Sequence, residues 1–238
     1  MIDYQLIRSA RRKTLLLQVK QGKITVRAPA RLPLCDINAF IHAKSEWLQQ
    51  KLAAQSLVAE HGIAVKTASF LPNSQITYLD RNYLIHVEFA AKSAVYVNDN
   101  KITVVLSYRQ QKNLLKDDDL AAQIKKSLAN YFKQQLHKYI DEKLPKFISL
   151  CQLSPKSYKI RYYKSCWGSC NNRAELSFNY LLMQLPSWVI DYVIVHELCH
   201  LKHLNHSADF WQLVQRYFPN YIQAKNWLKK NQQQLIWT

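Results

Sequence analysis

The amino-acid sequence predicts an α+β protein with a β-rich first half and a helix-rich second half. Two patterns support this prediction. Short runs of β-branched and aromatic residues, separated by turn-forming residues, fill residues 14–28 and 69–106. After residue 116, longer segments place apolar residues at helical spacing. We therefore expect an N-terminal β-rich region with one helix, residues 1–115, followed by a second domain, residues 116–238.

The first β-rich section has the pattern of a hairpin. Residues 14–28, TLLLQVKQGKITVRA, form two strand-like runs around Gln21 and Gly22, where glycine can supply the turn. Asp36 can cap the helix that follows. We expect this helix because a set of mostly apolar residues recurs at helical spacing. They are Ile37, Phe40, Ile41, Lys44, Trp47, Leu48 and Leu52.

The second β-rich section contains two further turns. Polar residues at 80–82 and at 98–100 each separate two strand-like runs, which indicates a turn at each position.

The second domain begins with the longest predicted helix. Its start is marked by residues 117–119, because three carboxylates suit the positive end of a helix dipole. We interpret this triplet as a helix start and not as a metal site, since consecutive helical residues point in different directions. Residues 157–183 then read as a strand, a glycine-containing turn and a second strand, and Pro186 and Ser187 begin another helix.

Charge and composition restrict the classes of partner. Thirty-three Lys and Arg against sixteen Asp and Glu give a formal charge of +17, which favours nucleic acid, nucleotides or acidic surfaces. The lysines are spread along the whole chain, so a solvated basic surface is the favoured interpretation. Only residues 8–13 hold a tight basic cluster, which can coat an exposed strand edge.

Other compositional features predict a cytoplasmic protein without membrane contact. No apolar stretch approaches membrane-spanning length, and the N-terminus lacks the apolar run of a signal peptide. The five cysteines form an odd set, which predicts free thiols.

The segment HELCHLKHLNH, residues 196–206, is rich in potential metal ligands. His196 and His200 are four positions apart on a predicted helix, an advance of about 6 Å along one face, so both imidazoles can reach one ion. Glu197 follows the first of them and can act as general base for water at that ion. This spacing is typical of a zincin helix and predicts a metallohydrolase core with one Zn²⁺, or another divalent ion, per chain.

A zinc hydrolase needs a third protein ligand and an open position for water. Asp209 is the only carboxylate after His200, so a distant downstream glutamate cannot serve. His203 would lie about 10 Å beyond His196 along the helix axis, which favours a role as helix-end residue or outer partner. We therefore predict His206 as the third ligand.

The position of His206 requires the chain to turn before it. We expect the helix to end near Leu204 and Asn205, because Asn tolerates the left-handed conformation that ends a helix. Ser207 can then cap a new helix that ends at Pro219.

The cysteines near this segment are not expected to bind metal. Cys199 lies on another face of the helix and has the character of a small buried apolar residue. Cys166 and Cys170 are separated by three residues and miss the common Cys-x-x-Cys zinc spacing, so a second zinc site or redox pair is a minor alternative.

Three segments carry a resemblance to a known family: RRKTLLLQVKQGKITVRAPARLP, CWGSCNNRAELSFNYLLMQLP and VIVHELCHLKHLNHSADFW. Together they resemble the YgjP-like metallopeptidase family, a zincin-like group related to the SprT-like proteases. The resemblance implies a zincin-like catalytic domain in the second half of the chain. It implies that the metal ligands are His196, His200 and His206 and that Glu197 is the catalytic glutamate.

The resemblance also covers the strand before the metal helix. Trp167 to Cys170 match the family's turn, and Asn179 matches an asparagine within the strand. Family members commonly carry Arg where this chain has Cys166. By analogy with zincin-like folds, we expect residues 175–182 to border the cleft and pair with an extended peptide.

We expect a zinc-dependent peptidase. The residues predicted to contact substrate are Trp167, Ser169, Asn179, Tyr180 and His203. Three side chains are candidates for stabilising the oxyanion: Tyr192, Tyr180 and His203.

Two alternatives stay open at this stage. A basic protein with a hydrolytic metal centre could act as a nucleoside triphosphate pyrophosphatase or phosphohydrolase, with Lys and Arg holding the phosphates. A nucleic-acid-binding protein could instead use its zinc structurally, in which case Glu197 would have no chemical role.

Overall fold

In the computed structural model the chain divides into two compact units, Met1–Lys66 and Thr67–Thr238. The described residues are 3–20, 23–49, 52, 70–112, 114, 117–231, 235 and 237. This division differs from the expected boundary after residue 115. The reason is that the strands between residues 75 and 107 share one hydrophobic core with the helices that follow them.

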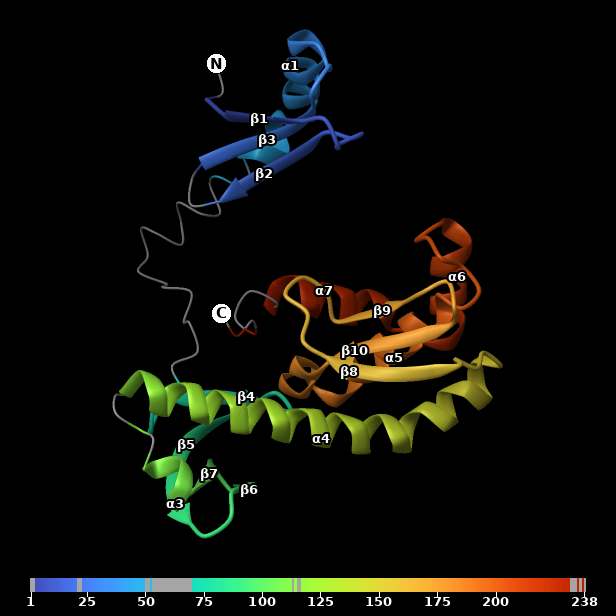
Figure 1. Cartoon of the computed structure of the whole chain (residues 1–238). Coiled ribbons are helices and arrows are strands. Elements are labelled where there is room, and N and C mark those ends of the chain that lie inside the picture. Colours follow the sequence, from blue (N-terminus) through green and yellow to red (C-terminus); the bar gives the residue numbers. More distant parts are fainter. Residues whose placement is uncertain are drawn as a thin grey trace. The chain divides into compact units, whose positions relative to one another are not determined.

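The N-terminal unit is a three-stranded sheet covered on one face by a helix (Figure 1). The strands β1 (Gln5–Ser9), β2 (Leu16–Lys20) and β3 (Lys23–Pro29) lie in the order β1-β3-β2. Alternate residues of β3 are buried against α1 (Leu34–Ala43). The two strands of the expected hairpin are antiparallel, as predicted, whereas the turn at Gln21 and Gly22 lies outside the described residues.

The helix of this unit differs in detail from the prediction. Pro33 occupies the N-cap position, and Asp36 lies within the first turn. The helix also ends at Ala43, because Lys44 leaves the helical conformation before helical residues resume at 45–49. The sequence pattern did not reveal this break, since the apolar spacing continues across it.

The second unit begins with a four-stranded sheet of order β4-β5-β7-β6. Its strands are β4 (Gln75–Tyr78), β5 (Arg81–Ala90), β6 (Ala94–Asn98) and β7 (Lys101–Ser107). Both expected turns are present, with positive φ at Leu79, Asp80 and Asp99. The short helix α3 (Tyr108–Gln111) follows β7.

The long helix α4 (Asp117–Cys151) connects the two sheets of this unit (Figure 1). It begins at the acidic triplet, as predicted, and continues through Pro145. Its buried stripe consists of Ile124, Leu128, Phe132, Leu136 and Ile140. In the part of the chain that the structure describes, no helix is both long and apolar enough to cross a bilayer.

A second sheet has the order β8-β10-β9. It contains β8 (Ser157–Arg161), β9 (Gly168–Cys170) and β10 (Glu175–Asn179). The expectation that residues 175–182 offer a free edge is wrong. β10 is the central strand, paired with β8 on one side and with β9 on the other, and residues 180–182 belong to a 3₁₀ helix.

The remaining elements complete the α+β fold that the sequence predicts. They are η1 (Tyr180–Gln184), α5 (Ser187–Cys199), α6 (Ala208–Tyr217) and α7 (Tyr221–Asn231). The central helix α5 contacts α4, β9, α6 and α7, and most of its side chains are buried. Because α5 and its C-cap residue His200 carry the His-Glu-x-x-His motif, these neighbours fix the position of the motif.

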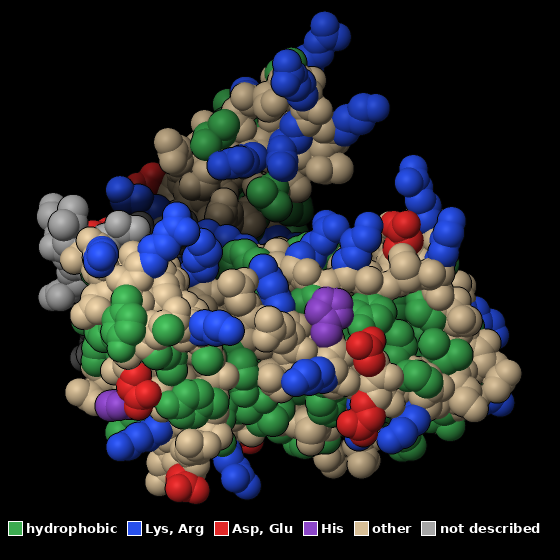
Figure 2. All heavy atoms as spheres, turned by 60° about the horizontal axis from the view of Figure 1, so that its bottom comes forward, with side chains coloured by type: hydrophobic (Ala, Val, Ile, Leu, Met, Phe, Trp, Pro, Cys, Tyr) green, Lys and Arg blue, Asp and Glu red, His purple; other side chains and the backbone are tan. Residues whose placement is uncertain are grey.

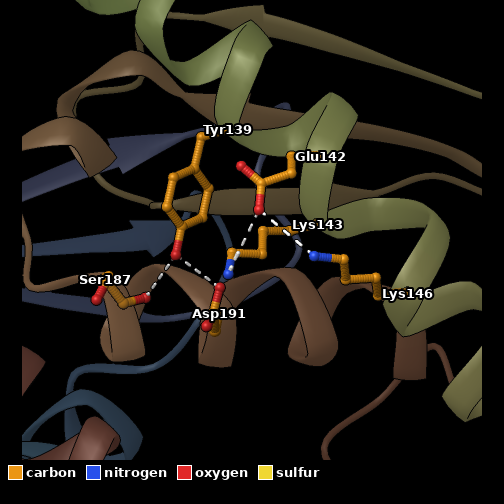
Figure 3. Close-up of polar contacts among 6 residues, drawn as sticks. All are labelled: Tyr139, Glu142, Lys143, Lys146, Ser187 and Asp191. Atoms are coloured by element: carbon orange, nitrogen blue, oxygen red, sulfur yellow. Dashed lines mark hydrogen bonds and ion pairs between the residues drawn. The ribbon is translucent and has the colours of Figure 1, made fainter.

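A polar contact joins α4 to the first half of α5 (Figure 3). The Tyr139 hydroxyl donates to Oδ1 of Asp191 at 2.7 Å and lies 3.1 Å from the carbonyl oxygen of Ser187. Burial raises the pKa of Asp191, while the hydrogen bond from Tyr139 opposes this shift. The contact therefore stabilises a partly buried carboxylate.

Tyr139→Phe should reduce the free energy of unfolding by about 1–2 kcal/mol, because the Asp191 carboxylate loses its donor. Urea unfolding of the full chain measures this change. Tyr96→Phe is the matched control, since the Tyr96 hydroxyl donates to Glu88 on the exposed sheet surface and its loss should change stability much less. Equal losses in the two variants would contradict the assigned role.

Candidate active site

A pocket of about 430 Å³ opens where β9, α5 and the loop after α5 meet. It is lined mainly by apolar and histidine side chains. The lining residues are Cys166, Trp167, Gly168, Ser169, Cys170, Tyr192, Val193, His196, Glu197, His200, Leu204, His206 and Leu228.

Three imidazoles converge in this pocket. Nε2 of His196 lies 3.2 Å from Nε2 of His200 and 3.1 Å from Nε2 of His206, and one ligand atom from each residue lies within 4.8 Å of the others. A tetrahedral zinc ion with Zn–N distances of about 2.0–2.1 Å holds its nitrogen ligands about 3.3 Å apart. The three histidines therefore fit a zinc ion, and they are the metal-binding group found among the described residues.

The chain reaches this arrangement by leaving the helix earlier than predicted. α5 ends at Cys199, and the backbone amides of Leu201 and Lys202 bond to carbonyls only three residues earlier. The expected left-handed turn at Asn205 is absent, since its φ is not positive. Ser207 caps α6 as predicted, by accepting a hydrogen bond from the amide of Phe210.

Hydrogen bonds orient the two helical histidines. Nδ1 of His200 lies 2.9 Å from the carbonyl oxygen of His203, so Nδ1 carries the proton and the Nε2 lone pair faces the triad. Nδ1 of His196 lies 3.4 Å from the Tyr192 hydroxyl. His203 thus acts through its backbone carbonyl, which agrees with its interpretation as an outer partner.

His206 is held differently, because no described residue forms a hydrogen bond with its Nδ1. Its ring stacks on Trp211, with centroids 5.5 Å apart, and meets Phe210 edge-on at 4.8 Å. The buried Phe210 ring also contacts His196 at 4.9 Å and His200 at 4.4 Å. The first turn of α6 therefore places one aromatic ring, Phe210, in contact with all three imidazoles.

The pocket favours neutral imidazoles. The pKa of His196 is lowered to about 3, mainly by burial and to a smaller extent by the neighbouring His200, His206 and Lys225. Burial likewise lowers the pKa of His206, with the same neighbours His200 and Lys225 contributing. Neutral rings at neutral pH offer the lone pairs that a divalent ion requires.

Glu197 is the buried carboxyl of the pocket, with 4% of its surface exposed. Burial raises its pKa to about 8, and Oε2 has no hydrogen-bond partner among the described residues. Its side chain packs directly against Gly168 of β9. A Cβ atom at position 168 would lie 2.6 Å from Oε1 and 2.7 Å from Cγ of Glu197, so only glycine fits beside this carboxyl.

The other predicted site residues divide into two groups. Trp167 and Ser169 line the pocket, as expected. Asn179 does not, because its side chain is buried and donates to the carbonyls of Tyr163 and Cys166. It organises the loop before β9.

Tyr180 also lies away from the pocket. It is buried in the core, where its ring contacts Trp237 and Tyr162. Of the three oxyanion candidates, only Tyr192 lines the pocket. Its hydroxyl faces Nδ1 of His196, on the side of the ring away from Nε2, and so it supports a ligand instead of facing substrate.

The cysteines are free thiols among the described residues, as predicted. Cys199 is buried outside the triad. Cys166 and Cys170 line the pocket, and burial followed by the charge of Glu197 raises the pKa of both thiols. At position 166 this chain therefore presents a neutral thiol to the pocket.

Sequence reasoning placed Gly168 in a turn and Leu204 at a helix end but gave neither a role in the pocket. It also gave no role to Leu228, which lines the pocket, or to Phe210, whose ring contacts the imidazoles. Gly168 could have been noticed, since the chain has only three glycines and this one lies between two predicted site residues. The apolar residues carried no local signal, because their role depends on the packing of distant elements.

Glu197→Gln should stabilise the metal-free protein, by an amount that grows with pH. A carboxyl whose pKa is near 4.5 when unfolded and about 8 when folded costs stability progressively as pH rises between these values. At pH 8 the variant should be more stable by on the order of 4 kcal/mol. Urea unfolding in chelator at pH 5 and pH 8 measures the difference.

Glu142→Gln is the control for this experiment, because it removes a carboxylate that is 64% exposed. Its effect on stability should be small, because solvent screens an exposed carboxylate. A constant stability difference between Glu197→Gln and the wild type across this pH range would argue against a buried, unpartnered carboxyl.

Gly168→Ala should displace the Glu197 side chain or β9, with a loss of about 1–3 kcal/mol in stability, since the added methyl overlaps the carboxyl. Thermal unfolding and zinc content report the change, and zinc should be retained because the histidines are not touched. Ser169→Ala, one residue further along β9, should be tolerated. Wild-type stability of Gly168→Ala would show that the contact is not tight.

Comparisons with known proteins identify the family of this chain. No curated protein matches the chain. Among solved structures, the metallopeptidase zymogen of Pyrococcus abyssi abylysin is 21% identical, with a TM-score of 0.36 and coverage of 39% of this chain and 95% of that chain. The YgjP-like metallopeptidase domain matches residues 13–231, nearly the whole chain. The chain therefore belongs to the YgjP-like metallopeptidase family.

Proposed function

We propose that this protein is a zinc-dependent peptidase whose ion is held by His196, His200 and His206. The observation that supports this most strongly is the convergence of three imidazole nitrogens beside a buried glutamate in one pocket. Three protein ligands leave a fourth position for water or substrate, as catalytic zinc sites require. A structural site would be closed by a fourth side chain.

Glu197 is the proposed general base. When bound, the ion would supply Lewis acidity that polarises the scissile carbonyl and lowers the pKa of water. The unpartnered Oε2 of Glu197 can accept a proton from the attacking water and then pass it to the leaving amine. The packing of Glu197 against Gly168 fixes the direction in which this carboxyl points.

The proposed substrate is an extended peptide bound along β9. This strand is the edge of its sheet, with β10 on its other side, and its residues line the pocket. Backbone groups at a free strand edge can pair with an incoming peptide. Trp167, Leu204 and Leu228 give the pocket an apolar lining, which favours peptides with an apolar side chain next to the scissile bond.

The pocket gives no support to a nucleotide substrate. A phosphohydrolase needs Lys or Arg beside the phosphates, but none of the described residues lining this pocket is Lys or Arg. Lys225 lies nearby, with its ammonium 4.1 Å from the centre of the Trp211 ring. Because this ammonium lies over an indole ring, Lys225 alone gives little support to phosphate binding.

Wild type and Glu197→Gln, both loaded with zinc, test the proposal against a panel of peptides and nucleoside triphosphates. The wild type should cleave peptides, and Glu197→Gln should retain zinc while losing at least about 100-fold in turnover. Phosphate or pyrophosphate release without peptide cleavage would overturn the peptidase assignment. Equal turnover of the two proteins would show that Glu197 is not the base.

Metal content tests the third ligand separately. His206→Ala should lose most bound zinc on dialysis against a weak chelator, because two histidines remain to hold it. His203→Ala should keep it, since the contact that His203 makes with His200 uses a backbone carbonyl. Equal losses in the two variants would contradict the assignment of His206.

A further inference from the structure

The N-terminal unit has an unusual charge distribution. Between Tyr4 and Cys35 the chain contains eight Lys or Arg residues and no Asp or Glu. This stretch includes all three strands of the small sheet. Lys and Arg side chains lie over much of the surface that Figure 2 shows, but within this stretch no carboxylate balances them.

The topology of the sheet concentrates this charge at one end. β1 runs parallel to β3, so Ser9 and Pro29 are partners at the ends of these strands, and the amide of Ala30 bonds to the carbonyl of Ser9. β2 begins at this same end, where Leu16 pairs with Arg27. Six of the eight basic residues belong to these strand ends and the loops that follow them: Arg8, Arg11, Arg12, Lys13, Arg27 and Arg31.

Arg8 has a structural role within this group. Its Nη1 atom contacts the carbonyl oxygens of Ala30 and Leu32 at 2.9 and 2.7 Å, and that of Pro29 at 3.4 Å. The Arg8 side chain thereby holds the loop after β3 against β1. The five other basic residues form no ion pair with any described residue.

The sheet face opposite α1 adjoins this charge. By strand register, Ile7 and Leu16 flank Arg27, and their side chains are 39% and 42% exposed. Asp36, in the first turn of α1, is the nearest carboxylate along the chain, and its contact is with the Cys35 thiol. We name the group of Arg11, Arg12, Lys13, Arg27 and Arg31 the basic end of the sheet.

We propose that the basic end of the sheet binds nucleic acid through its sugar–phosphate backbone. These five cations form no ion pair with a described residue and lie at one end of a small sheet. They can therefore contact the closely spaced phosphates of a polyanion, and release of counterions from the nucleic acid drives such binding. Arginine, which supplies four of the five, can form two hydrogen bonds with one phosphate.

An acidic membrane surface is a poorer partner for this surface. Membrane attachment depends on apolar area as well as charge, and Ile7 and Leu16 are the large apolar side chains exposed among the described strand residues of this sheet. Two half-exposed aliphatic side chains can lie against a sugar but offer little to a bilayer.

The test uses the full chain and a fluorescently labelled, mixed-sequence single-stranded 20-mer, with binding measured by anisotropy over a range of salt concentrations. Replacing Arg11, Arg12 and Lys13 together by Gln should weaken binding by about tenfold or more. It should also reduce the slope of log K against log salt by about 2, because three phosphate contacts are lost.

The charge-matched control replaces Lys138, Lys229 and Lys230, which are exposed on α4 and α7, by Gln. It lowers the net charge equally but should leave binding within about twofold of wild type. Equal weakening in both triple variants, no binding by the wild type, or binding of phosphatidylserine vesicles but not of the 20-mer would overturn the proposal. Glu197→Gln should bind the 20-mer like the wild type, so this test is independent of the peptidase test.

Discussion

The site depends on the contact between Glu197 and Gly168, where the edge strand β9 meets the central helix α5. The Glu197 carboxyl is only 4% exposed, and one of its oxygens has no hydrogen-bond partner among the described residues. This burial is unfavourable for stability, and the pKa of about 8 reflects that cost. The fold tolerates it because α5 is held by α4, α6 and α7 as well as by β9. A buried base with a fixed direction is what proton transfer from water requires.

Two kinds of support hold the three histidines. His196 lies on α5 and His200 is the C-cap residue of this helix, and their outer nitrogens face Tyr192 and the carbonyl of His203. His206 comes from a loop, and ring packing on Phe210 and Trp211 takes the place of a hydrogen bond. The early end of α5 and the capped start of α6 are therefore part of the site, because together they set the position of the third imidazole.

Local patterns in the sequence were sufficient to predict the α+β fold, the start of α4 and the spacing of the candidate ligands. They failed where distant segments decide the outcome. The end of α5 is set by three-residue backbone bonds after Cys199 and not by the conformation of Asn205. β10 is central because the three residues of β9 fold back beside it, and so short a strand has no detectable periodicity. Burial of Asn179 and Tyr180 likewise depends on tertiary packing.

The most direct test of this account is the position of zinc in crystals of the zinc-loaded protein, measured by anomalous scattering at the zinc absorption edge. The account predicts one peak about 2.0–2.1 Å from Nε2 of each of His196, His200 and His206, with no fourth protein ligand. A zinc ion bound by His203, Cys166 or Cys170, or a site closed by four side chains, would contradict it.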